Sequence, residues 1–302
     1  MGMEAMERSG PWAEKFAHPE VLELEGGKVE VVDLRPNNPK TAIPLVIEHG
    51  WVGQPAVSQR NSEMLANMGR RIIAINAPHG IKPSRENPDI PMAELRKAEA
   101  LTKTLDAKHI GKADVFTHSE GALFVTAAAL EQPERVRSII YFAPVGLIGP
   151  DSFLQLTKRF LADQAEQKKQ SRAGGGKERA AIEWVALQKA IGAMAAGPVQ
   201  SIAELRAIVT TQIEENLKAL REKGVKVIIM HPVNDKAFPM ERMQQMVKGN
   251  MVDGFLSVGD PKQSGGEIAD THNAWFLSPR EYSAAIDSLL DTIERNIAAE
   301  RA

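Results

Sequence analysis

A serine stands at a turn between two apolar segments, where its hydroxyl could act as a nucleophile. Ser119 belongs to the stretch Thr117-His118-Ser119-Glu120-Gly121, which follows the apolar run 113–116 and precedes the small-residue segment 121–130. The pattern predicts a strand, a sharp turn and a helix, which lifts the serine clear of a sheet and points the N–H of Glu120 toward incoming negative charge. A serine hydroxyl is a weak nucleophile at neutral pH and needs a nearby base, a role that suits histidine. The chemistry predicted here is attack on a carbonyl carbon.

This turn resembles the nucleophile elbow of the α/β-hydrolase family, Gly-x-Ser-x-Gly. Thr117 occupies the position of the first glycine, and Gly121 supplies the second. Small residues flank the serine in that family because strand and helix pass close together. A threonine at 117 therefore implies a local adjustment of the packing.

Two upstream segments extend the resemblance. The apolar run 43–48 ends in His49-Gly50-Trp51, which is similar to the family's His-Gly turn, where a backbone N–H completes the oxyanion hole. The resemblance implies that the N–H groups of Trp51 and Glu120 are the two oxyanion donors, with His49, Gly50 and Gly121 supporting them. A looser match is the stretch 76–84, similar to the family's Asp-x-Pro-Gly-x-Gly-x-Ser turn, with Asn76 in the Asp position.

Two downstream segments supply the remaining catalytic residue types. A buried-strand pattern at 225–230 precedes Asp235, and another near 254–258 leads through a polar loop to His272. Family members place the triad acid and the histidine after these strands, in the chain order Ser, Asp, His. The resemblance implies that Asp235 orients His272, which acts as the base for Ser119.

Each of these residues also has a structural interpretation. Ser119 could only cap a helix, and His272 could be a solvated loop histidine. Asp235 could be an ordinary loop acid, with Asp260 or Asp270 as the triad acid instead.

The other histidines are not assigned to the chemistry. His118 is interpreted as a packing or hydrogen-bonding group, and His49 as a brace for the oxyanion turn. The rest show no metal-ligand spacing and are His18, His79, His109 and His231. The sequence therefore predicts no metal site and no cofactor.

Strand-like and helix-like segments alternate along the chain, which predicts an α/β fold with a mostly parallel central sheet flanked by helices. The later strands are solidly apolar, as buried parallel strands are. The segment 28–34 alternates apolar and polar residues and is interpreted as a half-exposed edge strand. Helices are expected over 57–68, 92–107, 121–132, 240–247 and 281–298.

The stretch 146–224 contains no convincing strand and instead carries helical patterns around 153–170, 178–195 and 202–221. The α/β-hydrolase family often carries a helical cap at this connection. We therefore expect an N-terminal extension at 1–23, an α/β-hydrolase core at 24–145 and 225–302, and an inserted helical cap at 146–224. The glycine run 174–176 is interpreted as a tip of this cap and not as a phosphate loop, because no strand precedes it.

Composition narrows the class of protein. The 302 residues are 43% hydrophobic and 25% charged, with a net charge of −2, which is ordinary for a globular protein and gives no broad attraction to nucleic acid. The absence of cysteine excludes disulfides and thiolate chemistry. Residues 1–8 lack the features of a signal peptide, and no apolar stretch is long enough for a membrane span, so a cytoplasmic location is expected.

The resemblance implies a serine hydrolase that cleaves a carboxylic ester of a small to medium, largely uncharged acyl substrate through an acyl-enzyme intermediate. Thioester, lactone, amide and carbon–carbon bonds can be cleaved by the same machinery. Ser119 argues against epoxide hydrolases and haloalkane dehalogenases, which use an aspartate nucleophile. The alternatives are an acyltransferase of the same fold and a non-catalytic homologue that binds a ligand.

Overall fold

The structure is a computed structural model that describes residues 12–24, 27–51, 53–76, 90–149, 151–170, 184, 188, 191–192, 194–259 and 268–301. Its centre is an eight-stranded sheet in the order β1-β2-β4-β3-β5-β6-β7-β8. The strands are β1 (Glu20–Leu24), β2 (Gly27–Leu34), β3 (Leu45–Glu48), β4 (Ile72–Ile75), β5 (Ala113–His118), β6 (Val136–Phe142), β7 (Lys226–Pro232) and β8 (Gly254–Val258). β2 runs antiparallel to both of its neighbours, and the strands from β4 to β8 are parallel. The predicted fold class is confirmed.

Helices connect and cover these strands. The longer ones are α2 (Gln59–Asn67), α3 (Met92–Ala107), α4 (Gly121–Glu131), α5 (Phe153–Gln170), α7 (Pro198–Thr210), α8 (Glu214–Glu222) and α12 (Pro279–Arg301). The shorter ones are α1 (Ala13–Ala17), α9 (Met240–Met246), α11 (Ala274–Leu277) and the 3₁₀ turns η2 (Pro55–Ser58) and η3 (Pro133–Arg135).

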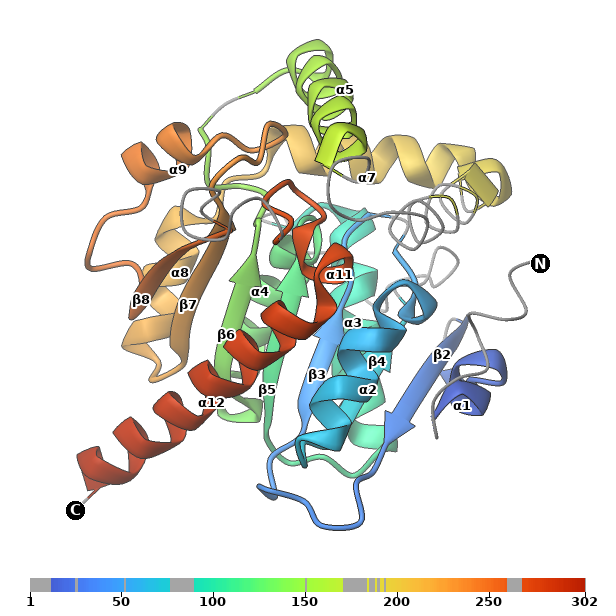
Figure 1. Cartoon of the computed structure of the whole chain (residues 1–302), viewed down its shortest axis with the longest axis vertical. Helices are drawn as coiled ribbons and strands as arrows, with labels where there is room; N and C mark the ends of the chain where they lie inside the picture. Colours follow the sequence, from blue (N-terminus) through green and yellow to red (C-terminus); the bar gives the residue numbers. More distant parts are fainter. Residues whose placement is uncertain are drawn as a thin grey trace.

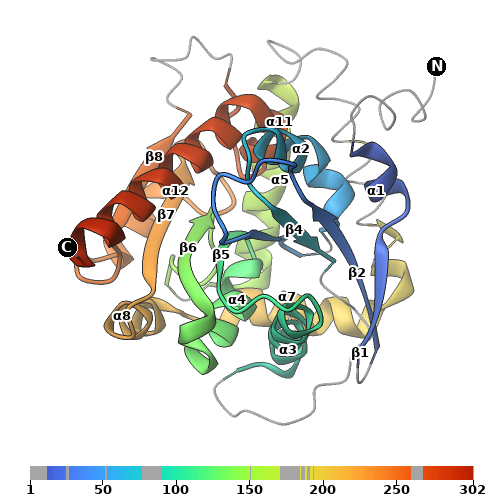
Figure 2. The same cartoon turned by 90° about the horizontal axis from the view of Figure 1, so that it is seen from below.

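Alternation along the buried strands divides the core into two layers, because successive side chains of a strand point to opposite faces. Val115 and Ile139 face one layer, whereas their neighbours Phe116 and Ile140 face the other. The first layer packs under α3, α4 and α8, and the second packs under α2, α11 and α12. Figure 2 shows these two sets of helices on opposite sides of the sheet.

The antiparallel end of the sheet differs from the prediction. β1 pairs with β2, so β2 is flanked on both sides and the edge-strand interpretation of 28–34 is wrong. The sheet also begins at Glu20, earlier than the expected start of the core at residue 24. The exposed, polar alternation of β1 gave no apolar run that could identify it as a strand.

The helical pattern at 202–221 forms two helices, α7 and α8, separated at 211–213. At this break the N–H of Ile213 donates to the carbonyl of Gly146 at 3.0 Å. Gly146 has φ of +81°, and a Cβ there would lie 3.2 Å from the carbonyl oxygen of Thr211. The chain thus leaves the sheet after β6 and returns to it at nearly the same point. α8 then packs on α4 and β7, while α5 and α7 lie along the upper edge of the sheet (Figure 1).

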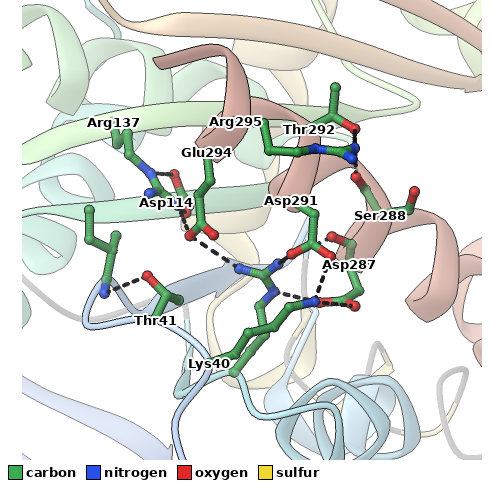
Figure 3. A network of polar contacts seen from close by, with 12 residues as sticks. Lys40, Thr41, Asp114, Arg137, Asp287, Ser288, Asp291, Thr292, Glu294 and Arg295 are labelled. Atoms are coloured by element: carbon green, nitrogen blue, oxygen red, sulfur yellow. Dashed lines mark hydrogen bonds and ion pairs between the residues drawn. The ribbon is translucent and has the colours of Figure 1, made fainter. Parts of the chain in front are cut away.

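Ion pairs hold α12 against the sheet. Arg70, between α2 and β4, is 1% exposed, and its guanidinium lies 2.6 Å from Asp287 and 2.5 Å from Asp291. Lys40 pairs with the same two carboxylates, and Figure 3 shows these groups beside Arg137, which bridges Asp114 and Glu294. A groove of about 660 Å³ runs along this part of α12, and none of the predicted site residues lines it.

Several predictions concern residues outside the described ranges. These are the N-terminal extension up to residue 11, most of the 76–84 turn, most of the 178–195 helix, the glycine run 174–176 and Asp260. In the described part of the chain, no helix combines the length and apolar character that crossing a bilayer requires.

Candidate active site

Ser119 lies at the carboxyl end of the central strand β5, in a strained backbone conformation. Its φ is +55°, a region that non-glycine residues seldom adopt. Three backbone hydrogen bonds hold it there: its N–H donates to the carbonyl of Phe142 at 3.0 Å, and its carbonyl accepts from Ala122 at 3.1 Å and Val145 at 3.2 Å. Such strain persists only where surrounding structure determines the conformation, and here it presents the hydroxyl above the sheet.

The threonine at the first glycine position of the elbow fits because Gly121 has no side chain. A Cβ at position 121 would lie 2.2 Å from Oγ1 of Thr117 and 3.1 Å from the carbonyl oxygen of His49. The close approach of α4 to β5 therefore requires glycine at position 121, and Thr117 occupies the space that a side chain there would fill.

Ser119, His272 and Asp235 come together although they are far apart in the sequence. The hydroxyl of Ser119 lies 3.0 Å from Nε2 of His272, and Nδ1 of His272 lies 2.8 Å from Oδ2 of Asp235. A carboxylate can only accept, so Nδ1 carries the proton and Nε2 is free to accept from the serine hydroxyl. The three side chains form a continuous hydrogen-bonded chain, and each residue is nearly completely buried.

The electrostatics of the pair favour a charged imidazole. Burial works against the positive charge of His272, but the charge of Asp235 and its hydrogen bond outweigh burial and raise the pKa of His272. Burial likewise acts to raise the pKa of Asp235, but the charge and hydrogen bond of His272 leave that pKa lowered. Both shifts stabilise imidazolium beside carboxylate, the state that forms when His272 takes a proton.

Aromatic rings surround the imidazole of His272. Ring centroids of His118, Phe238 and Phe160 lie 4.8, 5.1 and 5.6 Å away. His118 also faces the backbone, with its Nε2 3.1 Å from the carbonyl oxygen of His272, and burial lowers its pKa well below the usual value. A neutral His118 donates this hydrogen bond and positions the His272 loop, in keeping with its interpretation as a packing and hydrogen-bonding group.

The loop that carries Asp235 is closed by two hydrogen bonds. Phe238 N–H donates to Oδ1 of Asp235 at 2.9 Å, which leaves Oδ2 for His272. Nε2 of the buried His231 lies 2.8 Å from the carbonyl oxygen of Phe238. These bonds fix the direction of the carboxylate after β7.

The turn His49-Gly50-Trp51 lies against the serine. A Cβ on Gly50 would be 2.7 Å from Cβ of Ser119, so only glycine allows this approach. Within the described residues, neither the N–H of Trp51 nor that of Glu120 donates a hydrogen bond to another group. Both predicted oxyanion donors are therefore unpaired within the described part of the chain.

His49 braces this turn from behind. Its Nε2 lies 2.7 Å from the hydroxyl of Ser58, which itself donates to the carbonyl of Pro55 at 3.1 Å. Burial lowers the pKa of His49 to about 4, so the ring is neutral and donates to Ser58. Its contacts are those of a structural support.

A buried ion cluster lies beneath the elbow. Nζ of Lys97, on α3, is 2.7 Å from Oε1 of Glu120 and 3.0 Å from Oε1 of Glu204 on α7. Burial opposes the charge of Lys97, but the neighbouring carboxylates outweigh it and raise its pKa. Burial also raises the pKa of Glu94 and Glu48 well above the usual value. Lys97 thus links Glu120, the residue after the serine, to Glu204 on α7.

We expect Lys97→Met to lower the free energy of unfolding by roughly 3–5 kcal/mol, because it leaves buried carboxylates without their cation. Urea unfolding followed by circular dichroism measures this. Lys103→Met on the same helix, which removes a partly exposed partner of Glu99, is the control and should cost about 1 kcal/mol or less. Equal effects of the two substitutions would show that Lys97 does not hold the cluster together.

Of Asp235 and Asp270, the structure places Asp235 against His272, and it brings one further acid, Asp163, to the site. Oδ1 of Asp270 accepts from Gln170 at 2.5 Å, and it is Asp235 that contacts His272. The sequence does not single out Asp163, because a single acid in a helical segment carries no motif, yet Asp163 is completely buried against the loops of Asp235 and His272.

Comparisons with known proteins support the fold that carries this site. A sequence profile described as the alpha/beta hydrolase fold matches residues 43–192. No curated protein matches the chain by sequence. A carboxylesterase structure from the ammonia-oxidizing thaumarchaeon Nitrososphaera gargenis is similar with a TM-score of 0.64 and 17% identity, over 92% of this chain and 100% of that one.

Two further structures are similar to a comparable degree. A membrane phospholipase A, described as a bacterial virulence factor, has a TM-score of 0.63 and 15% identity, over 96% of this chain and 90% of that one. A thermophilic esterase from Thermogutta terrifontis has a TM-score of 0.62 and 15% identity, over 91% of this chain and 99% of that one. The profile match and the shared architecture identify this chain as an α/β-hydrolase-fold protein.

Proposed function

We propose that the protein is a serine hydrolase that cleaves a carboxylic ester through an acyl-enzyme intermediate. The observation that carries the proposal is the buried hydrogen-bonded chain from Ser119 through His272 to Asp235. A serine cap or a solvated histidine would not require these contacts, nor the strained backbone at Ser119. The esterases among the similar structures favour the same bond type.

In the proposed reaction, Nε2 of His272 takes the proton of Ser119 as its oxygen attacks the carbonyl carbon. The oxyanion that forms accepts from the N–H groups of Trp51 and Glu120, each worth roughly 3–4 kcal/mol of barrier. Asp235 stabilises the imidazolium, which then protonates the departing alkoxide. Water, deprotonated by His272, then attacks the acyl carbon. The bond between that carbon and the oxygen of Ser119 breaks, His272 returns the proton to the serine oxygen, and the acid is released.

We further propose that residues 146–224 include a cap that shapes the acyl pocket. Two observations support this. α5 touches the loops of Asp235 and His272, and the ends of the part 146–213 lie together, where Ile213 donates to Gly146. A cap over the site would exclude water and select the acyl chain.

A panel of p-nitrophenyl esters from acetate to decanoate tests the proposal. We expect turnover of at least the shorter esters, with release of free acid and with a preference for one range of chain lengths. Release of p-nitrophenol only when an acceptor alcohol is added, with the acyl group found on that alcohol, would show an acyltransferase. No release from any ester, together with no labelling by a fluorophosphonate, would indicate a ligand-binding protein and contradict the proposal.

A further inference from the structure

One face of α5 directs polar side chains at the two loops that carry Asp235 and His272. Nε of Arg159 donates to the carbonyl of Ala237 at 2.9 Å, and Oε1 of Gln167 accepts from Asn273 at 3.1 Å. Gln170, one turn further, contacts Asp270. Residues three and four apart share a helix face, so positions 159, 163, 167 and 170 form one stripe.

Asp163 stands in the middle of this stripe and joins both loops. Its Oδ1 accepts from the backbone N–H of Lys236 at 3.0 Å and from that of His272 at 3.3 Å. These are the residue after the proposed triad acid and the proposed triad base itself. A single buried oxygen thus sets the spacing of two loops that follow different strands.

The other oxygen of Asp163 is unusual for a buried carboxylate. Oδ2 has no hydrogen-bond partner among the described residues, although the side chain is fully buried. Burial, with the charge of Asp235 adding to it, raises the pKa of Asp163 to about 6. At neutral pH Asp163 is therefore mostly anionic, and its charge favours the protonated form of His272.

Resting on the proposed function, we propose that Asp163 is a positioning residue of the reaction. Its carboxylate holds the Asp235 and His272 loops in register and places a second negative charge beside the imidazole. α5 would then contribute to the chemistry and not only to substrate selection. An acid that merely stabilised α5 would not need to accept from the backbone of His272.

The charge and the hydrogen bonds of Asp163 can be separated by substitution. Asp163→Asn keeps a carbonyl oxygen that can accept from both N–H groups but removes the charge, whereas Asp163→Ala removes both. Glu166→Gln is the matched control: it removes a carboxylate from the same helix, and the contacts of Glu166 are with Gln170 and Lys169.

The readout is the titration of His272, followed by NMR of the imidazole C–H signals without substrate. The signal of His272 is assigned by its absence from a His272→Ala protein. Because a nearby negative charge raises the pKa of an imidazole, removing that charge must lower the pKa of His272. The variants Asp163→Asn, Asp163→Ala and Glu166→Gln all retain the other titratable or charged groups around Asp163 and His272. These groups are Asp235, His231, His118, Arg159 and Lys236.

We expect the titration midpoint of His272 to move to lower pH in Asp163→Asn and to stay unchanged in Glu166→Gln. With an ester substrate, kcat should fall about tenfold in Asp163→Asn and roughly 100-fold in Asp163→Ala, with KM little changed. Should Asp163→Ala fail to fold, the Asn protein decides alone. An unchanged midpoint and unchanged kcat in Asp163→Asn would overturn the inference while leaving the hydrolase intact. If the proposed function is wrong, the wild-type protein will be inactive toward esters. The change in the titration midpoint of His272 caused by Asp163→Asn can still be measured in that case.

Discussion

Ser119→Ala should lower kcat for p-nitrophenyl esters by roughly 10⁴- to 10⁶-fold, because no other atom replaces the attacking oxygen. The fold should be preserved, since the hydroxyl contacts only His272 among the described residues and the three backbone bonds of the elbow remain. Steady-state kinetics measures the rate, and thermal unfolding followed by circular dichroism checks the stability.

The control for this substitution is Ser138→Ala. Ser138 is a completely buried serine on the neighbouring strand β6, and its hydroxyl donates to Asp114 at 2.6 Å, away from the site. This protein should keep its kcat. If Ser119→Ala retained wild-type activity, Ser119 would not be the nucleophile.

Asp235→Asn should lower kcat by about 10⁴-fold. The amide that replaces Oδ2 can donate to Nδ1 of His272, which moves the ring proton to Nε2 and leaves no acceptor for the serine hydroxyl. Loss of the carboxylate also removes the charge that raises the pKa of His272. The acidic limb of the pH–rate profile, where activity is lost as His272 becomes protonated, should therefore move to lower pH in whatever activity remains.

The rival acids provide the comparison. Asp270→Asn should cost far less, because that carboxylate forms hydrogen bonds with Gln170 and Asn234, whereas His272 bonds to Asp235. Asp260→Asn should also cost far less if Asp235 is the acid. The ranking of kcat among the three asparagine variants is the measurement, and a larger loss at 260 or 270 would show that the acid was assigned wrongly.

Much of the fold could be predicted because buried parallel strands consist of continuous apolar runs. The pattern near 254–258 coincides with β8, the pattern at 225–230 lies almost wholly in β7, and the 92–107 helix coincides with α3. β1 was missed because a partly exposed strand has no such run, and this omission made β2 look like an edge. The break at 211–213 was missed because it depends on packing against Gly146, a contact between distant residues.

The site was predictable where chemistry depends on local sequence. The elbow and the His-Gly turn are short motifs, so Ser119 and Gly50 could be chosen from neighbouring residues alone. Asp235 and His272 required the family's chain order, and their contact with each other is a tertiary fact. Asp163 could not be found, since a helix pattern does not show which buried loop its polar face will meet.

Active-site labelling tests the identity of the nucleophile most directly. The wild-type protein is treated with a fluorophosphonate, digested with trypsin and examined by mass spectrometry, with Ser119→Ala treated in parallel. The tryptic peptide 113–135 contains Ser119 and no other serine, so a modified serine in it is unambiguous. We predict one label per chain, located at Ser119 and absent from the variant. A label on a different residue, or equal labelling of the Ser119→Ala protein, would contradict the assignment of Ser119 as the attacking group.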